Sequence, residues 1–113
     1  MKEWKVRYYE KANGRCPVKD YIDELDVHSK AKVVRTIELL EEFGIELSSP
    51  HVKHIVDKIW ELRVSSERIF YFIYRNEDII LLHGFTKKKQ KIAAREIEIA
   101  QNRYQDFNKG IHS

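Results

Sequence analysis

The spacing of hydrophobic and polar positions changes several times along the chain, and each change predicts a different element. Apolar or aromatic side chains alternate with other residues over positions 4–10, which is typical of a half-buried strand. An Asn13-Gly14 pair then indicates a loop. Pro17 can open a short helix over residues 17–25, because proline is tolerated at the first helical position.

A longer helix is expected next, between a capping residue and a stop. Ser29 has a side chain suited to the N-cap, and Gly44 is a natural C-terminal stop. Apolar residues recur between them at the spacing of one helical face. Residues 47–54 follow and contain a Ser-Ser-Pro breaker, so we expect them to form a connection.

Three strands and a final helix complete the predicted elements. Residues rich in aromatic and branched side chains predict strands over 58–64, 67–75 and 78–86. The intervening pairs, Ser65-Ser66 and Asn76-Glu77, are short enough for tight hairpin loops. Apolar positions at helical spacing predict a last helix over 90–107, followed by a frayed tail over 108–113.

The order of these elements indicates the fold class. A strand, two helices, a three-stranded antiparallel meander and a C-terminal helix favour an α+β fold with helices on one face of a sheet. We find no repeat, low-complexity tract or linker, and 113 residues is an ordinary length for one domain. We therefore expect a single domain over residues 1–113.

The hairpins predict which side chains share a face of the sheet. If both loops have two residues, directly paired residues point to the same side. One face would then carry a polar and cationic group: Glu61, Arg63, Arg68, Phe70, His83 and Phe85, with Lys87 where the strand runs on. The same face would be apolar at its other end, through Phe72, Tyr74, Ile79 and Leu81. The opposite face would be uncharged and covered by helices: Trp60, Leu62, Ile69, Tyr71, Ile73, Ile80 and Leu82, with Gly84.

Two arginines are the most informative members of the cationic face. Arg63 lies opposite Arg68 in this register, and like charges placed there repel. An anion bound between them would explain the pair, and so would neutralisation by Glu61 in a surface ion cluster. His83 is either a structural histidine or a proton-transfer group beside those cations. Phe85 suits either base stacking or cross-strand packing.

A basic run follows the last predicted strand. No acidic residue occurs from Ile79 to Arg95, and the run contains Lys87, Lys88, Lys89, Lys91 and Arg95. Lysines at the start of a helix are opposed by its macrodipole, so a polyanion such as RNA or DNA would explain them. A solubilising lysine cluster is the alternative. The net charge of +3 does not decide between these interpretations.

Composition limits the compartment and the cofactors. The single cysteine, Cys16, cannot build a disulfide framework or a cysteine-based zinc site within one chain, and it fits a reducing cytoplasm. The start of the chain lacks the apolar run of a signal peptide, and no segment approaches the roughly 20 apolar residues of a membrane span. His51, His54 and Asp57 match no strong metal-ligand spacing. We expect a cytoplasmic protein with no metal, no other cofactor and no membrane contact.

Several segments together resemble a known family of toxins. They are IWELR at 59–63, RIFYF at 68–72, LLHGFTKK at 81–88 and REIEIA at 95–100, with Arg103 beyond them. They resemble the phage-derived HigB-like branch of the RelE/ParE toxin superfamily, over about residues 53–106. Ile92-Ala93 departs from the pattern, since relatives often carry Thr-Pro there, and the last helix lacks an evident tyrosine in its first turn.

The resemblance implies a RelE-like microbial RNase toxin fold and the toxin of a type II toxin–antitoxin system. The implied activity is metal-independent cleavage of mRNA on the ribosome. The implied partner is a helix-turn-helix antitoxin, through which alone the toxin would meet operator DNA. A ParE-type gyrase inhibitor with the same fold, and a non-catalytic antitoxin-binding protein, are the alternatives.

RNA can be cut without a metal because its own 2′-hydroxyl can attack the adjacent phosphate. The protein must then align the attack, take a proton and stabilise negative charge. We expect Arg68 and Arg63 to clamp the phosphate, Lys87 to add charge, and His83 or Glu61 to act as general base. The residues expected to bind RNA are Lys88, Lys89, Lys91, Phe85 and Arg95.

Overall fold

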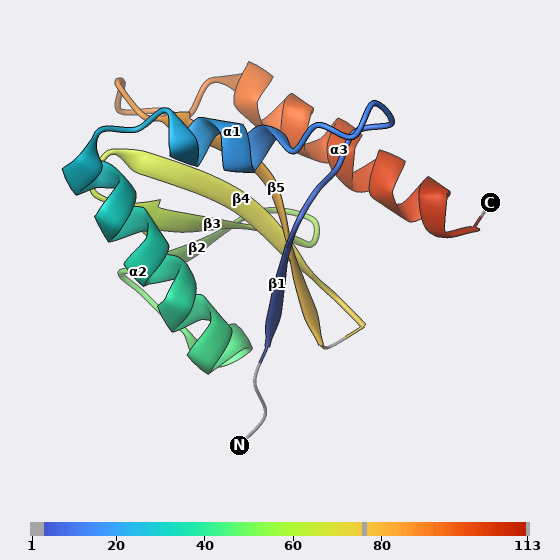
Figure 1. Ribbon diagram of the computed structural model, residues 1–113, viewed down its shortest axis with the longest axis horizontal. Coiled ribbons are helices and arrows are strands. Elements are labelled where there is room, and N and C mark those ends of the chain that lie inside the picture. Colours follow the sequence, from blue (N-terminus) through green and yellow to red (C-terminus); the bar gives the residue numbers. More distant parts are fainter. Residues whose placement is uncertain (1–3, 76, 113) are drawn as a thin grey trace.

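The computed structural model describes residues 4–75 and 77–112, and it confirms the predicted α+β fold (Figure 1). In chain order the elements are β1 (Lys5–Tyr8), α1 (Pro17–Asp23), α2 (Val27–Phe43), the 3₁₀-helix η1 (Gly44–Glu46), β2 (Val52–Val56), β3 (Ile59–Val64), β4 (Glu67–Tyr74), β5 (Asp78–Thr86) and α3 (Ala94–His112). Within these described ranges no helix is long and apolar enough to cross a membrane. Predictions that fall on residues 1–3, 76 and 113 lie outside them.

The strands form one sheet in the order β1-β5-β4-β3-β2. β1 runs parallel to β5, and the other neighbours are antiparallel. The prediction of a connection over residues 47–54 is wrong, because β2 begins at Val52 and pairs with β3 along one edge of the sheet. β2 is short and contains Lys53 and His54, so it lacks the apolar alternation from which strands are recognised.

Helices cover both faces of the sheet rather than one, which corrects a second prediction. Figure 1 shows α1 and α2 on one side of the strands and α3 crossing the other. The apolar stripe of α3 packs on aromatic side chains of β4, with ring centroids of Phe72 and Tyr104 4.6 Å apart and those of Phe72 and Phe107 5.5 Å apart. The expected exposed apolar end of the cationic face is therefore buried, because the stripe of α3 needs an apolar partner.

The β4–β5 hairpin differs from the prediction by one residue at its loop end. Tyr74, rather than Arg75, pairs with Asp78, so the loop has three positions instead of two. A register shift between Phe70 and Tyr71 then restores the predicted pairing of Phe70 with His83. The end of the sheet that carries the candidate site consequently has the predicted register, whereas the loop end does not.

Leu82 of β5 is the extra residue at this register shift, since it has no partner on β4. The β5 residues before it therefore point to the opposite face from the one predicted. Ile80 and Leu82 pack in the cluster beneath α3. Ile79 and Leu81 pack in the cluster beneath α1 and α2. Both pairs were predicted on the opposite faces, because a regular two-residue hairpin admits no inserted residue.

Helix ends agree with the sequence in part. Asp26, not Ser29, is the N-cap of α2, and its Oδ1 accepts a hydrogen bond from the Ser29 backbone N–H at 2.9 Å. Gly44 ends the helix as predicted, with a φ of 53° that suits glycine. α3 begins at Ala94 and runs to His112, so the predicted tail is helical where the structure describes it.

Candidate functional site

The paired strands β3 and β4 place two arginines directly opposite each other, as predicted. Arg63 pairs with Arg68, and Glu61 pairs with Phe70 two residues along β3. Residues paired in this way point to the same face of the sheet. The three charged side chains therefore share the face that α3 partly covers.

Glu61 lies between the two arginines and is almost fully buried, at 2 % exposure. Its Oε1 lies 3.6 Å from Arg63 Nε, and its Oε2 lies 3.8 Å from Arg68 Nε. These separations allow charge attraction but are too long for hydrogen bonds. Glu61 Oε2 and Arg68 Nε are buried polar atoms without a hydrogen-bond partner in the part of the chain that the structure describes. The ion cluster is present, yet its hydrogen-bonding capacity is incompletely used.

The two guanidinium groups are held to different degrees. Arg68 donates through one terminal nitrogen to the backbone carbonyls of Ser65 at 2.6 Å and Glu67 at 2.9 Å. Its side chain is 10 % exposed, whereas that of Arg63 is 38 % exposed. Arg63 makes no hydrogen bond through its side chain to any described residue. Arg68 is thus fixed at the β3–β4 turn, and Arg63 can adjust to a ligand.

His83 belongs to a separate polar cluster that joins β5 to α3. Its Nε2 lies 2.7 Å from Glu96 Oε1, and its Nδ1 lies 3.3 Å from a terminal nitrogen of Arg103. Because the Glu96 carboxylate accepts hydrogen bonds, the His83 proton lies on Nε2, and Nδ1 is the acceptor. Burial lowers the pKa of His83, outweighing Glu96, which raises it, while Arg103 and Arg95 lower it further. Both ring nitrogens are engaged, so the predicted role of His83 as general base would require this cluster to open.

The two phenylalanines of the cationic face lie in the hydrophobic core. Phe70 is fully buried and Phe85 is 8 % exposed, with ring centroids 5.2 Å apart. The His83 ring stacks on Phe85 at 5.5 Å. Base stacking by Phe85 stays a prediction, and in the present arrangement the ring is occupied by protein neighbours.

The lysine-rich segment lies before α3 rather than on its first turn. Because the helix begins at Ala94, the argument from the macrodipole is wrong for the four lysines, and Arg95 alone of the basic run lies on that turn. The Lys87 backbone N–H donates to the Ser66 carbonyl at 2.7 Å, which keeps Lys87 at the arginine end of the sheet. The exposed residues of the run are Lys88, Lys89, Lys91 and Arg95.

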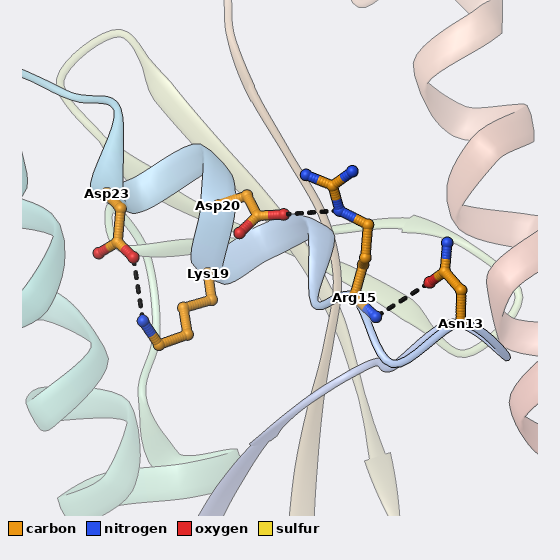
Figure 2. Close-up of polar contacts among 5 residues, drawn as sticks. All are labelled: Asn13, Arg15, Lys19, Asp20 and Asp23. Atoms are coloured by element: carbon orange, nitrogen blue, oxygen red, sulfur yellow. Dashed lines mark hydrogen bonds and ion pairs between the residues drawn. The ribbon is translucent and has the colours of Figure 1, made fainter.

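Several cations elsewhere on the surface are paired with acids. Figure 2 shows Arg15 beside Asp20 at 3.8 Å and Lys19 beside Asp23 at 2.9 Å, on and just before α1. Within residues 4–75 and 77–112, the side chains of the basic run form no such ion pairs: Lys87, Lys88, Lys89, Lys91 and Arg95. The run therefore keeps its full positive charge next to the arginine pair.

Sequence reasoning missed the partners that position His83. Glu96 and Arg103 are seven residues apart on α3, a spacing that places them on one helical face. Arg103 also donates to the Leu82 carbonyl at 2.9 Å. An acid and a base at this spacing on an otherwise apolar stripe were the available signal, although nothing in the sequence indicated which strand they would meet.

Comparison with known families identifies the group. The profile described as "Phage derived protein Gp49-like (DUF891)" matches residues 20–105, which is more than two thirds of the chain. The chain belongs to the Gp49-like family. This family is toxin-like and related to the RelE and HigB type II toxins. The matched range contains both arginines, Glu61, His83 and the basic run.

No curated protein matches the chain significantly. Membership in the Gp49-like family is consistent with a toxin of a toxin–antitoxin system.

Proposed function

We propose that this Gp49-like protein is the toxin of a type II toxin–antitoxin system and that it cleaves mRNA on the ribosome without a metal. The observation that carries the proposal is the pair of arginines opposite each other around a buried carboxylate. With Glu61 ionised, the cluster has a net charge of +1, from two cations and one anion. Stability alone gives little reason for two facing arginines, and a phosphodiester supplies the missing negative charge.

The proposed reaction uses the nucleophile within RNA itself. The 2′-oxygen attacks the adjacent phosphorus, the bond from phosphorus to the 5′-oxygen breaks, and the products carry a 2′,3′-cyclic phosphate and a 5′-hydroxyl. The proton of the 2′-hydroxyl passes to a base, and the departing 5′-oxygen takes a proton from solvent. Arg63 and Arg68 hold the nonbridging oxygens and stabilise their additional charge, for which planar, permanently charged guanidinium groups are suited.

The remaining predicted residues surround this centre. Lys87 stays near Arg68 through its backbone bond to Ser66, and the exposed lysines beyond it attract the RNA strand. Glu61 holds both arginines in place, whereas its burial keeps it from direct contact with solvent. His83 or Glu61 as general base remains a prediction from sequence.

The partners in this proposal follow from the family relationship and from charge. A toxin that acts in the cell requires an antitoxin, which we expect to be a helix-turn-helix protein that also binds operator DNA. The ribosome would present mRNA to the basic surface. Co-purification of an untagged helix-turn-helix protein encoded beside this chain would test the first of these expectations.

The decisive test removes the clamp. Arg68→Ala should abolish growth arrest on induced expression and lower mRNA cleavage on ribosomes by about 10²-fold or more, because charge stabilisation of the transition state is lost. RNA ends are mapped by primer extension, and circular dichroism confirms that the variant is folded. Arg35→Ala, on the exposed surface of α2, is the matched control and should retain cleavage.

Full toxicity of a folded Arg68→Ala variant would refute the clamp. Trapping of gyrase on DNA by the wild-type protein, without any cleavage of mRNA, would instead establish the gyrase-inhibitor alternative.

A further inference from the structure

The edge strand β2 presents its two faces to different surroundings. Lys53 pairs with Glu61, and His54 pairs with Trp60. Lys53 therefore points to the face of the arginine cluster, and His54 points to the opposite face. The rings of His54 and Trp60 confirm the second assignment, since their centroids are 5.2 Å apart.

One backbone hydrogen bond joins the residue before β2 to β3. The Arg63 backbone N–H donates to the His51 carbonyl at 2.8 Å, which places His51 opposite Arg63 and extends the β2–β3 register by one position. One row across the sheet then consists of His51, Arg63 and Arg68, and the next row begins with Lys53 and Glu61. The sequence did not predict this edge of the cluster, because residues 47–54 were interpreted as a connection.

The side chains of Lys53 and His51 are available for a ligand. Lys53 is exposed and His51 is partly exposed. Within the described residues neither side chain makes a hydrogen bond or an ion pair. His83, by contrast, has both ring nitrogens engaged. Beside the arginine pair, His51 is thus the imidazole with free nitrogens.

We propose that β2 completes the RNA-binding site, with Lys53 as a third phosphate-binding cation and His51 as the base that takes the 2′-hydroxyl proton. The inference rests on the proposed ribonuclease function and names residues for it that sequence analysis did not select. A second, buried observation supports an anionic ligand here, since the donor Arg68 Nε has no hydrogen-bond partner among the described residues.

The spacing of β-strands makes this arrangement feasible. Diagonal neighbours on adjacent strands lie roughly 7–8 Å apart at their Cα atoms, within reach of long side chains, so Lys53 and Arg63 can contact one phosphate. His51 is directly opposite Arg63, which places its ring beside the clamped phosphate. The charged groups that face His51 on this side of β2 and β3 are Lys53, Glu61 and Arg63.

The first experiment measures binding without cleavage. The probe is a fluorescein-labelled single-stranded RNA with 2′-O-methyl groups throughout, followed by fluorescence anisotropy over a series of salt concentrations. Lys53→Gln should weaken binding about tenfold at low salt and reduce the slope of log K against log salt by about 0.7, the value for one lost phosphate contact on a single strand. Lys58→Gln is the matched control, because Lys58 is an exposed lysine in the β2–β3 turn, five residues from Arg63. It should change neither quantity.

The second experiment measures proton transfer. His51→Gln should lower kcat for cleavage of ribosome-bound mRNA about 10²-fold or more, leave KM nearly unchanged and remove the acidic limb of the pH–rate profile. His54→Gln is the control on the opposite face of the same strand and should retain the wild-type profile. Circular dichroism verifies that all four variants are folded.

The outcomes separate this inference from the function on which it rests. If Arg68→Ala loses cleavage while Lys53→Gln and His51→Gln behave like their controls, the role of β2 is refuted and the ribonuclease proposal stands. If the wild-type protein neither binds the probe nor cleaves mRNA on ribosomes, both proposals fail. Loss of binding in Lys53→Gln together with loss of the acidic limb in His51→Gln supports the completed site.

Discussion

Glu61→Gln tests the electrostatic balance at the centre of the site. The substitution keeps the size of the side chain and removes its charge, so Arg68 becomes a nearly buried cation without a counter-charge. Breaking a buried ion pair by removing one partner costs about 3–5 kcal/mol. Two features place the cost of Glu61→Gln at the lower end of this range. Arg68 keeps its carbonyl acceptors at 2.6 and 2.9 Å, and the side chain of Arg63 is 38 % exposed. We expect a loss of about 3 kcal/mol in the free energy of unfolding.

The assay is urea unfolding at pH 7 in a buffer free of phosphate and sulfate, followed by tryptophan fluorescence. Urea is preferred because guanidinium would screen the charges. Glu98→Gln, an exposed position on α3, is the control and should change stability by no more than about 0.5 kcal/mol. Added inorganic phosphate should then stabilise Glu61→Gln more than the wild type, because an anion can occupy the place of the lost carboxylate.

Two results would overturn this reasoning. A Glu61→Gln variant as stable as Glu98→Gln would show that the carboxylate does not compensate the arginines. Equal stabilisation of the variant and the wild type by phosphate would show that the charge of Glu61 does not affect anion binding by the arginines.

Three further substitutions test the packing around the site. Tyr9→Phe removes the hydrogen bond donated to Asp106 at 2.5 Å and should lower the free energy of unfolding in urea by about 1 kcal/mol. Burial and this bond raise the pKa of Tyr9 to about 12, so the hydroxyl keeps its proton and can donate at neutral pH. Gly84→Ala would place a Cβ 2.5 Å from the ring of Tyr21 and should lower stability by about 1–3 kcal/mol, seen as a reduced Tm; an unchanged Tm would contradict this contact. Because burial lowers the pKa of His83, the unfolded chain binds its proton more readily, so stability should fall as pH drops below about 6.5. His83→Gln should flatten that dependence, measured as the free energy of unfolding between pH 5 and about 7.

The central hairpins could be predicted from sequence because their residues satisfy several requirements at once. The β3–β4 loop was assigned two residues, and the pairing of Arg63 with Arg68 followed directly and is confirmed. The shared face of Glu61 with these arginines followed from the two-residue period of a strand. Local spacing was therefore sufficient to predict strand pairing and shared faces where the backbone is regular.

The rest of the fold depended on tertiary contacts that local spacing does not encode. The inserted residue Leu82 exchanges the faces of Ile80 and Ile79, and a bulge of this kind has no apolar pattern of its own. β2 was not predicted because an edge strand pairs with only one neighbour and tolerates polar residues such as Lys53. The position of α3 on the cationic face was likewise decided by packing rather than by the periodicity of the helix.

Among the described residues the sheet has two open edges, at β1 and at β2. An unpaired edge is a template on which a second copy of a chain could add its own strand, and charged side chains discourage that stacking. Lys5 on β1 and Lys53 on β2 are both exposed, so each edge carries a positive charge that opposes pairing with the edge of a second copy. We therefore expect the lysine that we assign to RNA to disfavour edge-to-edge association as well. Neutralising it should make the protein more prone to aggregate at high concentration.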